Sequence, residues 1–248
     1  RLGITGLRDR KNYGLALTLG GGEVSLLDHT YAYSVLANGG VMAGVPVPPQ
    51  RREPGFRELD PVSILKVTDN RGNVITEFKG PTVKEVLSPQ VAYLLTHVMS
   101  DEQARIPSYG PGSALLLSRP AAAKTGTTNN YFDAWTMGYN PQIAVGVWMG
   151  NSDHTMMNNM WGGRGPGPIW HDIMEYALKP LPKVDFVEPP GIKWVEVDAE
   201  SGLLPGPYTR VRKRELFIEG HEPTAVDNTH KEFAICKESG KLATNYCP

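Results

Sequence analysis

The sequence predicts an α+β fold in which helices pack on part of a mostly antiparallel sheet, with a small β-rich C-terminal appendage. Three strand-like segments follow one another with connections of a few residues, which is typical of antiparallel neighbours. These segments are 121–127, 134–139 and 143–150. Helical patterns occupy other stretches, and prolines between 180 and 190 mark a linker. We therefore expect two units, residues 1–180 and 181–248.

Composition excludes several classes of protein. The chain has 248 residues, with 25 Lys and Arg against 26 Asp and Glu, so a net charge of −1 gives no electrostatic reason to expect nucleic acid as a partner. With 40% hydrophobic and 21% charged residues it is too apolar for a disordered chain. No apolar run reaches the roughly 18 residues that a membrane span needs. The chain begins at Arg1, and we expect it to be a segment of a longer protein.

The first helix is indicated by its ends. Ser25 is a candidate N-cap with Asp28 three residues later, and Asn38-Gly39-Gly40 stops the pattern. Between them, apolar residues recur at helical spacing. The next segment, residues 41–60, is rich in Pro and Gly and is expected to be loop.

The remaining elements follow from turn and cap signals. Segments 62–67 and 73–78 flank Asp69-Asn70-Arg71-Gly72 and predict a β-hairpin. Ser88-Pro89 predicts a second helix start, and 168–178 predicts a helix after a long loop. In the tail, residues 193–204 and 232–243 share a weak pattern of strand, Glu-Ser-Gly turn and strand.

The strongest chemical signal is Lys124-Thr125-Gly126-Thr127 on the first strand of the sheet. Because strand side chains alternate, both threonines share one face and Lys124 points to the other. Two hydroxyls on one face can hold a carboxylate, and Gly126 lets a ligand approach the strand edge. Lys124 can supply a fixed positive charge, and the backbone N–H of Thr127 can serve as an oxyanion donor.

Other candidate sites are better explained by structure. His171 and Glu175 are four residues apart on a predicted helix, but no third ligand accompanies them, so no metal and no cofactor are expected. Trp135 and Trp148 are expected to pack in the sheet rather than bind carbohydrate, whereas Trp161, which lies among glycines, could line a cleft. Cys236 and Cys247 lie close together in the tail, and their spacing alone leaves free thiols and a disulfide equally open.

A longer stretch around the Lys-Thr-Gly resembles a known family. The segment AAAKTGTTNNYFDAWTMGYNPQIAVGVWMGN, from residue 121, resembles the third active-site motif and following strands of a penicillin-binding transpeptidase, most closely the bifunctional class A penicillin-binding proteins. The segments ALTLGGGEVSLLDHTYAYSVLANGG, VLSPQVAYLLTHVMSD and GPIWHDIMEYAL also fit, as does the cysteine tail. The resemblance covers most of residues 1–180 and, more loosely, the rest. It implies a fold like that of the transpeptidases and serine β-lactamases.

The family's other two active-site motifs are missing from the sequence. No Ser-x-Asn occurs, and the one Ser-x-x-Lys runs from Ser63 to Lys66. That motif needs a helix, which places its Ser and Lys on one face, whereas here it lies in the predicted hairpin. We therefore do not expect Ser63 to be a nucleophile. The chain resembles the C-terminal part of a transpeptidase, so activity of the isolated chain is uncertain.

The resemblance implies a function for the parent protein. It would cross-link peptidoglycan stem peptides by serine acyl transfer, and β-lactam antibiotics would acylate the same serine. Lys124 and Thr127 map onto catalytic positions of the motif, whereas Thr125, Gly126 and Thr128 map onto or beside substrate-binding positions. The alternatives are a non-catalytic transpeptidase-like binding module or another serine hydrolase of the β-lactamase or carboxypeptidase type.

The resemblance also implies partners and a location. Besides stem peptides and β-lactams, the partner of this chain is the missing N-terminal part of the same protein. The domain is expected on the extracytoplasmic face of the cell membrane, anchored by a segment absent from this chain. That setting favours a disulfide between Cys236 and Cys247 over free thiols.

Overall fold

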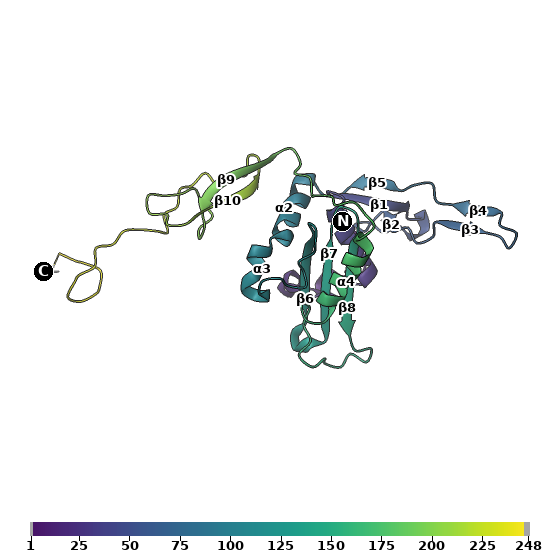
Figure 1. The fold of residues 1–248 in the computed structure, drawn as a ribbon, viewed down its shortest axis with the longest axis horizontal. Coiled ribbons are helices and arrows are strands. Elements are labelled where there is room, and N and C mark those ends of the chain that lie inside the picture. The colour runs from purple at the N-terminus through teal and green to yellow at the C-terminus, as the bar shows by residue number, and fades with distance from the viewer. Residues whose placement is uncertain (1, 246–248) are drawn as a thin grey trace. The chain divides into compact units, whose positions relative to one another are not determined.

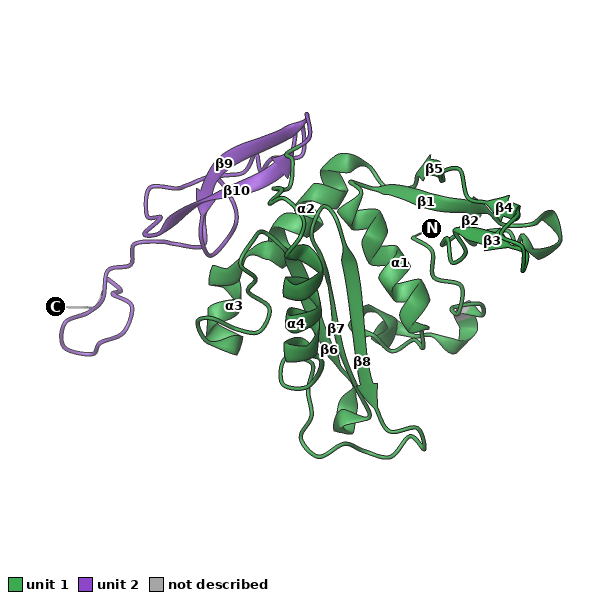
Figure 2. Cartoon of the chain, turned by 45° about the vertical axis from the view of Figure 1, so that its right-hand side comes forward, with its two compact units in different colours: residues 1–188 green, residues 189–248 purple. Residues whose placement is uncertain are grey.

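The computed structural model describes residues 2–245, and the chain divides into two compact units, residues 1–188 and 189–248 (Figure 2). The division falls later than the boundary predicted at residue 180. The reason is that the first part of the linker belongs to unit 1. Leu181 packs against the main hydrophobic core, and the ring of Phe186 meets that of Tyr139 edge-on with 5.8 Å between centroids.

Unit 1 is built on the predicted antiparallel sheet, in the order β6-β7-β8 (Figure 1). The strands are β6 (Ala122–Thr127), β7 (Asp133–Tyr139) and β8 (Ala144–Gly150). Asn140 closes the turn between β7 and β8, because its Oδ1 accepts the N–H groups of Gln142 and Ile143 at 3.0 and 2.8 Å. The sheet and its connections confirm the sequence prediction.

Helices cover both faces of this sheet. α1 (Leu26–Ala37) packs on one face, where a Cβ at Gly146 would meet Thr30 and Leu26. α4 (Pro166–Leu178) packs on the other, where a Cβ at Gly138 would lie 2.4 Å from the ring of Trp170. Met137 is the cross-strand partner of Gly146, so these two residues share one face of the sheet. Gly138 follows Met137 in β7 and therefore belongs to the other face. Glycine at these two positions lets the helices approach the sheet closely.

The core forms where α4 meets the sheet. Trp170, Met174 and Leu178 recur every four residues along α4, and all three side chains are fully buried. They pack against alanines of the β6 region and against Leu115 and Leu117. A second helix, α2 (Pro89–Ser100), starts at the predicted cap Ser88, and its Thr96 hydroxyl lies 2.7 Å from that of Tyr139.

The start of α1 is also a buried polar junction. Ser25 caps the helix as predicted, since its hydroxyl accepts the N–H of Asp28 at 3.1 Å. The Asp28 carboxylate accepts the Thr5 hydroxyl at 2.6 Å and pairs with the guanidinium of Arg57. Burial alone would raise the pKa of Asp28, but the hydrogen bonds from Thr5 and Arg57 together outweigh it and lower the pKa.

The prediction that residues 41–60 are loop was wrong. They contain β1 (Val41–Pro46), which pairs with both β2 (Leu59–Asp60) and β5 (Thr82–Glu85) in a second antiparallel sheet. Gly44 is needed in β1 because a Cβ there would lie 2.2 Å from the carbonyl oxygen of Asp60. The glycine that suggested a loop therefore permits a close strand contact.

The other elements differ from the predictions mainly at their ends. The hairpin is shorter than predicted, with β3 (Lys66–Thr68) and β4 (Val74–Glu77), and α4 begins two residues early at Pro166. α3 (Glu102–Tyr109) was not predicted, since Pro107 lies inside it. Short 3₁₀ helices complete the unit: η1 (Arg10–Asn12), η2 (Leu15–Leu19), η3 (Pro49–Arg51) and η4 (Asn129–Tyr131). None of the described helices is long and apolar enough to cross a membrane.

Unit 2 is a β-hairpin with extended loops, formed by β9 (Ile192–Asp198) and β10 (Arg212–Ile218) in antiparallel register. The two Glu-Ser-Gly turns share a backbone pattern. Gly202 N–H donates to the carbonyl of Asp198, and Gly240 N–H donates to that of Cys236, both at 2.9 Å. Both glycines have positive φ. The predicted similarity of the two segments therefore holds at their turns.

Candidate active-site strand

The Lys-Thr-Gly motif lies on an edge strand. β6 is the first strand of the sheet order, so its outer edge is paired with no other strand among the described residues. Its first two residues, Ala122 and Ala123, are buried under the helices, which fixes the strand in place. The remaining four residues run from Lys124 to Thr127, and of these Lys124 and Thr127 are exposed. The motif is therefore held rigidly at one end and open to a ligand at the other.

The side chains alternate as predicted. Thr125 lies opposite Thr136, and Thr127 lies opposite Ala134, on the face that α4 covers further along the sheet. Lys124 lies opposite Met137 on the other face, and its Nζ donates to the carbonyl of Thr125 at 2.6 Å. The lysine thus folds over the edge of its own strand, where it places its charge beside the open backbone.

The two threonine hydroxyls are not equivalent. Thr125 is partly buried, and its hydroxyl is hydrogen-bonded to that of Tyr109, which comes from the end of α3. Thr127 is exposed, and its Oγ1 accepts the N–H of Gly162 at 3.1 Å, so its own O–H is left to donate. The structure therefore brings both threonines to one face, as expected, but the Thr125 hydroxyl is engaged with Tyr109, whereas the O–H of the exposed Thr127 is left to donate.

The backbone of β6 presents further groups at its open edge. The N–H of Thr128 donates to the carbonyl of Asp133 at 3.0 Å, so the pair Thr127–Ala134 is a non-hydrogen-bonded pair of the ladder. In such a pair, N–H and C=O both point away from the neighbouring strand. The N–H and C=O of Thr127 therefore point to the open edge, where an added peptide could pair with them.

Thr128 follows the last residue of β6 and builds the turn after it. Its Oγ1 accepts the N–H of Asp133 at 2.7 Å, which closes the loop containing η4. Asn130 and Tyr131 in this loop have positive φ without being glycines. The hydroxyl of Thr128 is thus used inside the turn.

Aromatic residues border the Lys124 face of the sheet. Trp135 lies opposite Gly126, and its ring approaches those of Trp148 and His29, with centroids 6.4 and 5.6 Å apart. His29 belongs to α1, and burial lowers its pKa, so the ring is neutral near pH 7. Sequence reasoning did not single out His29, Tyr109 or the backbone of Gly162, because each comes from a segment distant from the motif.

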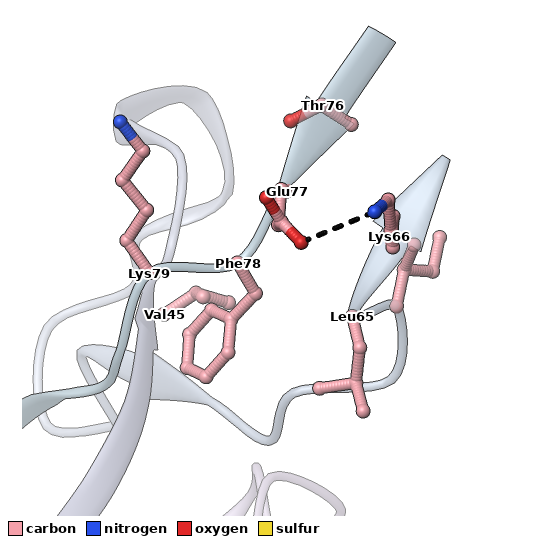
Figure 3. Close-up of a pocket in the computed structure, with 8 residues that line it drawn as sticks. Val45, Leu65, Lys66, Thr76, Glu77, Phe78 and Lys79 are labelled. Atoms are coloured by element: carbon pink, nitrogen blue, oxygen red, sulfur yellow. Dashed lines mark ion pairs between the residues drawn. The ribbon is translucent and has the colours of Figure 1, made fainter. Parts of the chain in front are cut away.

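The serine of the Ser-x-x-Lys lies elsewhere. Ser63 precedes β3 outside any helix, and Lys66 begins that strand and pairs with Glu77 at 3.5 Å. A shallow groove of about 320 Å³ runs beside this hairpin, with Val45, Leu65 and Phe78 along it (Figure 3). No residue of β6 lines this groove. The expectation that Ser63 lacks the helical setting of a nucleophile is confirmed.

The histidine and glutamate that were not expected to bind a metal make local contacts instead. Glu175 accepts both the N–H and the hydroxyl of Ser118 and so anchors the loop before β6, while His171 lies beside Asp172 at 3.2 Å. Cys236 is buried, whereas Cys247 lies outside the described residues. The proposed disulfide between them therefore stays a prediction.

Comparison with known proteins identifies relatives. Residues 188–232 match the family described as "Penicillin-binding protein 1A, C-terminal domain". The chain is 31% identical to penicillin-binding protein 2D of Bacillus subtilis over 85% of its length, and 33% identical to penicillin-binding protein 1A of Aquifex aeolicus over 88%. These matches cover 28% and 27% of the two relatives, so the chain spans about a quarter of their length.

A solved structure shows the same fold. The crystal structure of penicillin-binding protein 1A from Haemophilus influenzae superposes with a TM-score of 0.68, covering 88% of this chain and 36% of that one. The sequence identity is 23%, so this similarity supports the fold. The predicted fold class, a mostly antiparallel sheet with packed helices and a small β-rich tail, is confirmed.

Proposed function

Since the chain belongs to the class A penicillin-binding proteins, we propose that it is the C-terminal part of a peptidoglycan D,D-transpeptidase and that β6 binds the acyl donor. One observation carries this proposal. At the open edge of β6, Lys124, the Thr127 hydroxyl and the outward backbone groups of Thr127 all lie within one short stretch of strand. A positive charge, a hydroxyl donor and a free strand edge are what an extended peptide with a terminal carboxylate requires.

The reaction follows from these groups. A serine outside this chain attacks the carbonyl carbon of the D-Ala–D-Ala amide, and the Thr127 N–H donates to the oxyanion that forms. The C–N bond breaks, the terminal D-Ala leaves as a protonated amine, and an acyl-enzyme remains. An amine of a second stem peptide then attacks this ester, forms the cross-link and releases the serine with its proton restored.

Each residue from Lys124 to Thr128 has a role in this scheme. The Thr127 hydroxyl donates a hydrogen bond to the carboxylate of the bound stem peptide. The Lys124 ammonium attracts the same carboxylate and polarises a neighbouring hydroxyl. Gly126 keeps the edge open to the ligand backbone. Thr125 also faces the site, and it positions the strand through its bond to Tyr109. Thr128 shapes the end of the site by closing the turn after β6.

The same scheme assigns partners and a location. β-Lactams acylate the same serine, and the N-terminal part of the same protein supplies that serine and the Ser-x-Asn. The domain acts on the extracytoplasmic face of the cell membrane, anchored by a segment outside this chain. The isolated chain has no turnover of its own, because the nucleophile is elsewhere.

Acylation of the parent protein by a fluorescent penicillin tests the proposal. Lys124→Ala should slow acylation by orders of magnitude, since a fixed charge at the site acts mainly in the transition state. Thr127→Val should weaken recognition of the ligand carboxylate by about 1–3 kcal/mol, the range for a lost hydrogen bond to a charged group. Lys66→Ala in the hairpin is the matched control and should leave the rate unchanged.

Two results would contradict the proposal. Unchanged acylation rates in both β6 variants would show that this strand does not line the site. Stoichiometric labelling of the isolated chain, above all at Ser63, would show that the nucleophile lies within it.

A further inference from the structure

Unit 2 contains a buried cluster of two carboxylates and one imidazole that the proposed function does not use. Asp198 ends β9, and Asp227 and His230 lie in the segment after β10. One ligand-type atom from each of the three residues lies within 4.8 Å of the other two. The segment is held beside the loop that follows β9 by its backbone, since Asp227 N–H donates to the carbonyl of Leu204 at 2.7 Å.

Each carboxylate is oriented by its neighbours. One oxygen of Asp198, Oδ1, accepts the N–H groups of Glu200 and Ser201, both at 2.9 Å. Likewise, Oδ1 of Asp227 accepts the Thr229 hydroxyl at 2.6 Å. The second oxygens turn toward His230, whose Nδ1 lies 3.3 Å from Asp198 Oδ2 and 2.9 Å from Asp227 Oδ2. One oxygen from each carboxylate therefore lies close to the same imidazole nitrogen, and the three atoms are within 4.8 Å of one another.

The charges of this cluster do not balance by themselves. The side chains of Asp198 and Asp227 are each 1% exposed, so two negative charges are buried together. A protonated His230 would leave a net charge of −1, and no Lys or Arg of the described residues forms an ion pair with either carboxylate. The single proton on Nδ1 is nearest to Asp227. Oδ2 of Asp198 is buried 3.3 Å from the same nitrogen and makes no hydrogen bond by geometry, although the Ser201 N–H and the Thr209 hydroxyl help to lower the pKa of Asp198. Such an atom is costly unless a cation satisfies it.

We propose that Asp198 Oδ2, Asp227 Oδ2 and His230 Nδ1 bind one Zn²⁺ ion, with water as the fourth ligand. A divalent cation with a neutral imidazole brings the net charge of the cluster to zero. Zinc bonds of about 2.0 Å place tetrahedral ligand atoms about 3.3 Å apart, close to the two distances from Nδ1. An imidazole ligand favours Zn²⁺ over Ca²⁺ or Mg²⁺, which prefer oxygen alone.

The surroundings of the imidazole fit this role. Its second nitrogen, Nε2, lies 3.3 Å from Oε2 of Glu200. Metal-binding histidines commonly donate their other N–H to a carboxylate, which fixes the tautomer and the ring orientation. Glu200 is thus a positioning residue for His230.

A bound metal ion would also stabilise unit 2, which has a small hydrophobic core. Its buried hydrophobic side chains among the described residues are Val197, Leu216 and Cys236, whereas several others such as Phe233 and Ile235 are more than half exposed. A unit with so small a core commonly depends on a disulfide or a metal ion for stability. Ion binding would join the end of β9 to the segment after β10 and stabilise the folded state.

Titration of the 248-residue chain with zinc chloride tests the proposal. The protein carries no affinity tag, is stripped with a chelator, and is treated with iodoacetamide so that free thiols cannot bind metal. Calorimetry near neutral pH should show one saturable site per chain, and zinc should raise the unfolding temperature of unit 2. Cobalt(II) in place of zinc should give the visible absorption of a four-coordinate site.

Variants identify the ligands. Asp227→Asn and His230→Gln should each lower zinc affinity by at least about 100-fold, and Glu200→Gln by about 10-fold, the lower end of the range for positioning residues. His221→Gln, a change at an exposed histidine of the same unit, is the matched control and should bind like the wild type. Circular dichroism of each variant checks that the strands form.

Specific results would overturn the proposal. They are the absence of a saturable 1:1 site in the wild-type chain, or full retention of binding in His230→Gln. In the first case the cluster is an ion triad held by a protonated His230. Either result would leave the role of β6 untouched, because the penicillin assay reads a different unit.

Discussion

Unit 1 and unit 2 are both built on antiparallel strands, but different interactions stabilise them. In unit 1 the sheet is covered on both faces, and a row of fully buried side chains on α4 fills the space against it. In unit 2 the hairpin buries few hydrophobic residues, and polar turns and the Asp198–Asp227–His230 cluster connect its loops. The comparison suggests that substitutions in the core should act on unit 1, whereas covalent or ionic changes should act on unit 2.

The largest expected effect is the loss of Trp170 from the core of unit 1. Trp170→Ala should lower the free energy of unfolding of unit 1 by about 3–5 kcal/mol, because it leaves a cavity against Gly138. Trp170→Phe should cost much less, since the buried indole N–H has no partner to lose. Urea unfolding monitored by hydrogen exchange would measure the loss of unfolding free energy in both variants. Equal loss of protection in β9 and β10 would contradict the expectation that a core substitution acts on unit 1.

Reduction of the predicted disulfide should act on unit 2. In the native protein, closing the loop between Cys236 and Cys247 should stabilise the tail by about 2–3 kcal/mol in the chain-entropy model. Reductant should therefore loosen residues 230–248 and leave the exchange of amides in β6–β8 unchanged. Two free thiols in denatured protein never exposed to reductant would refute the bridge.

Acid should weaken unit 1 through Asp28 at its buried polar junction. Since the folded-state pKa of Asp28 lies below its ordinary value of 3.8, its contribution is present above that pH and is lost as the pH falls through the folded-state pKa. The difference in unfolding free energy between wild type and Asp28→Asn should therefore shrink as the pH is lowered below about 4. A difference that stays constant down to pH 2 would show that Arg57 does not favour the ionised carboxylate.

The smallest effect is expected at the cap of α1. Ser25→Ala should cost about 1 kcal/mol, since it removes the hydroxyl that accepts the N–H of Asp28. Ser25→Asp should retain the cap. Thermal unfolding would measure both variants, and equal stability of Ser25→Ala and wild type would mean that water replaces the cap without cost.

The sequence allowed good prediction where the signal was local. The ends of α1 followed from Ser25 and Asn38-Gly39-Gly40, and the faces of β6 followed from strand alternation. β1 could not be recognised, because its partner β5 is distant in the chain and Gly44 resembled a loop residue. α3 could not be recognised either, because Pro107 lies inside it and proline is typical of loops rather than helix interiors.

The candidate site was predictable in part for the same reason. The motif alone predicts Lys124 and Thr127 as site residues. The hydrogen bonds between Tyr109 and Thr125 and from Gly162 N–H to Thr127 depend on the packing of distant segments. The polar cluster of unit 2 escaped prediction entirely, since Asp198 lies far along the chain from Asp227 and His230. Local patterns thus identify the residues that face a site, and tertiary packing decides which of them remain free.

The open edge of β6 has a consequence for handling the protein. An edge that can pair with a substrate peptide can also pair with a strand of another molecule, and exposed strand edges of this kind promote aggregation. Lys124 lies on that edge, and a lysine there discourages such pairing through charge and bulk. Lys124→Ala therefore removes a side chain that discourages aggregation as well as the charge of the site. Its state of association at working concentration must be measured before a slow acylation rate is assigned to chemistry.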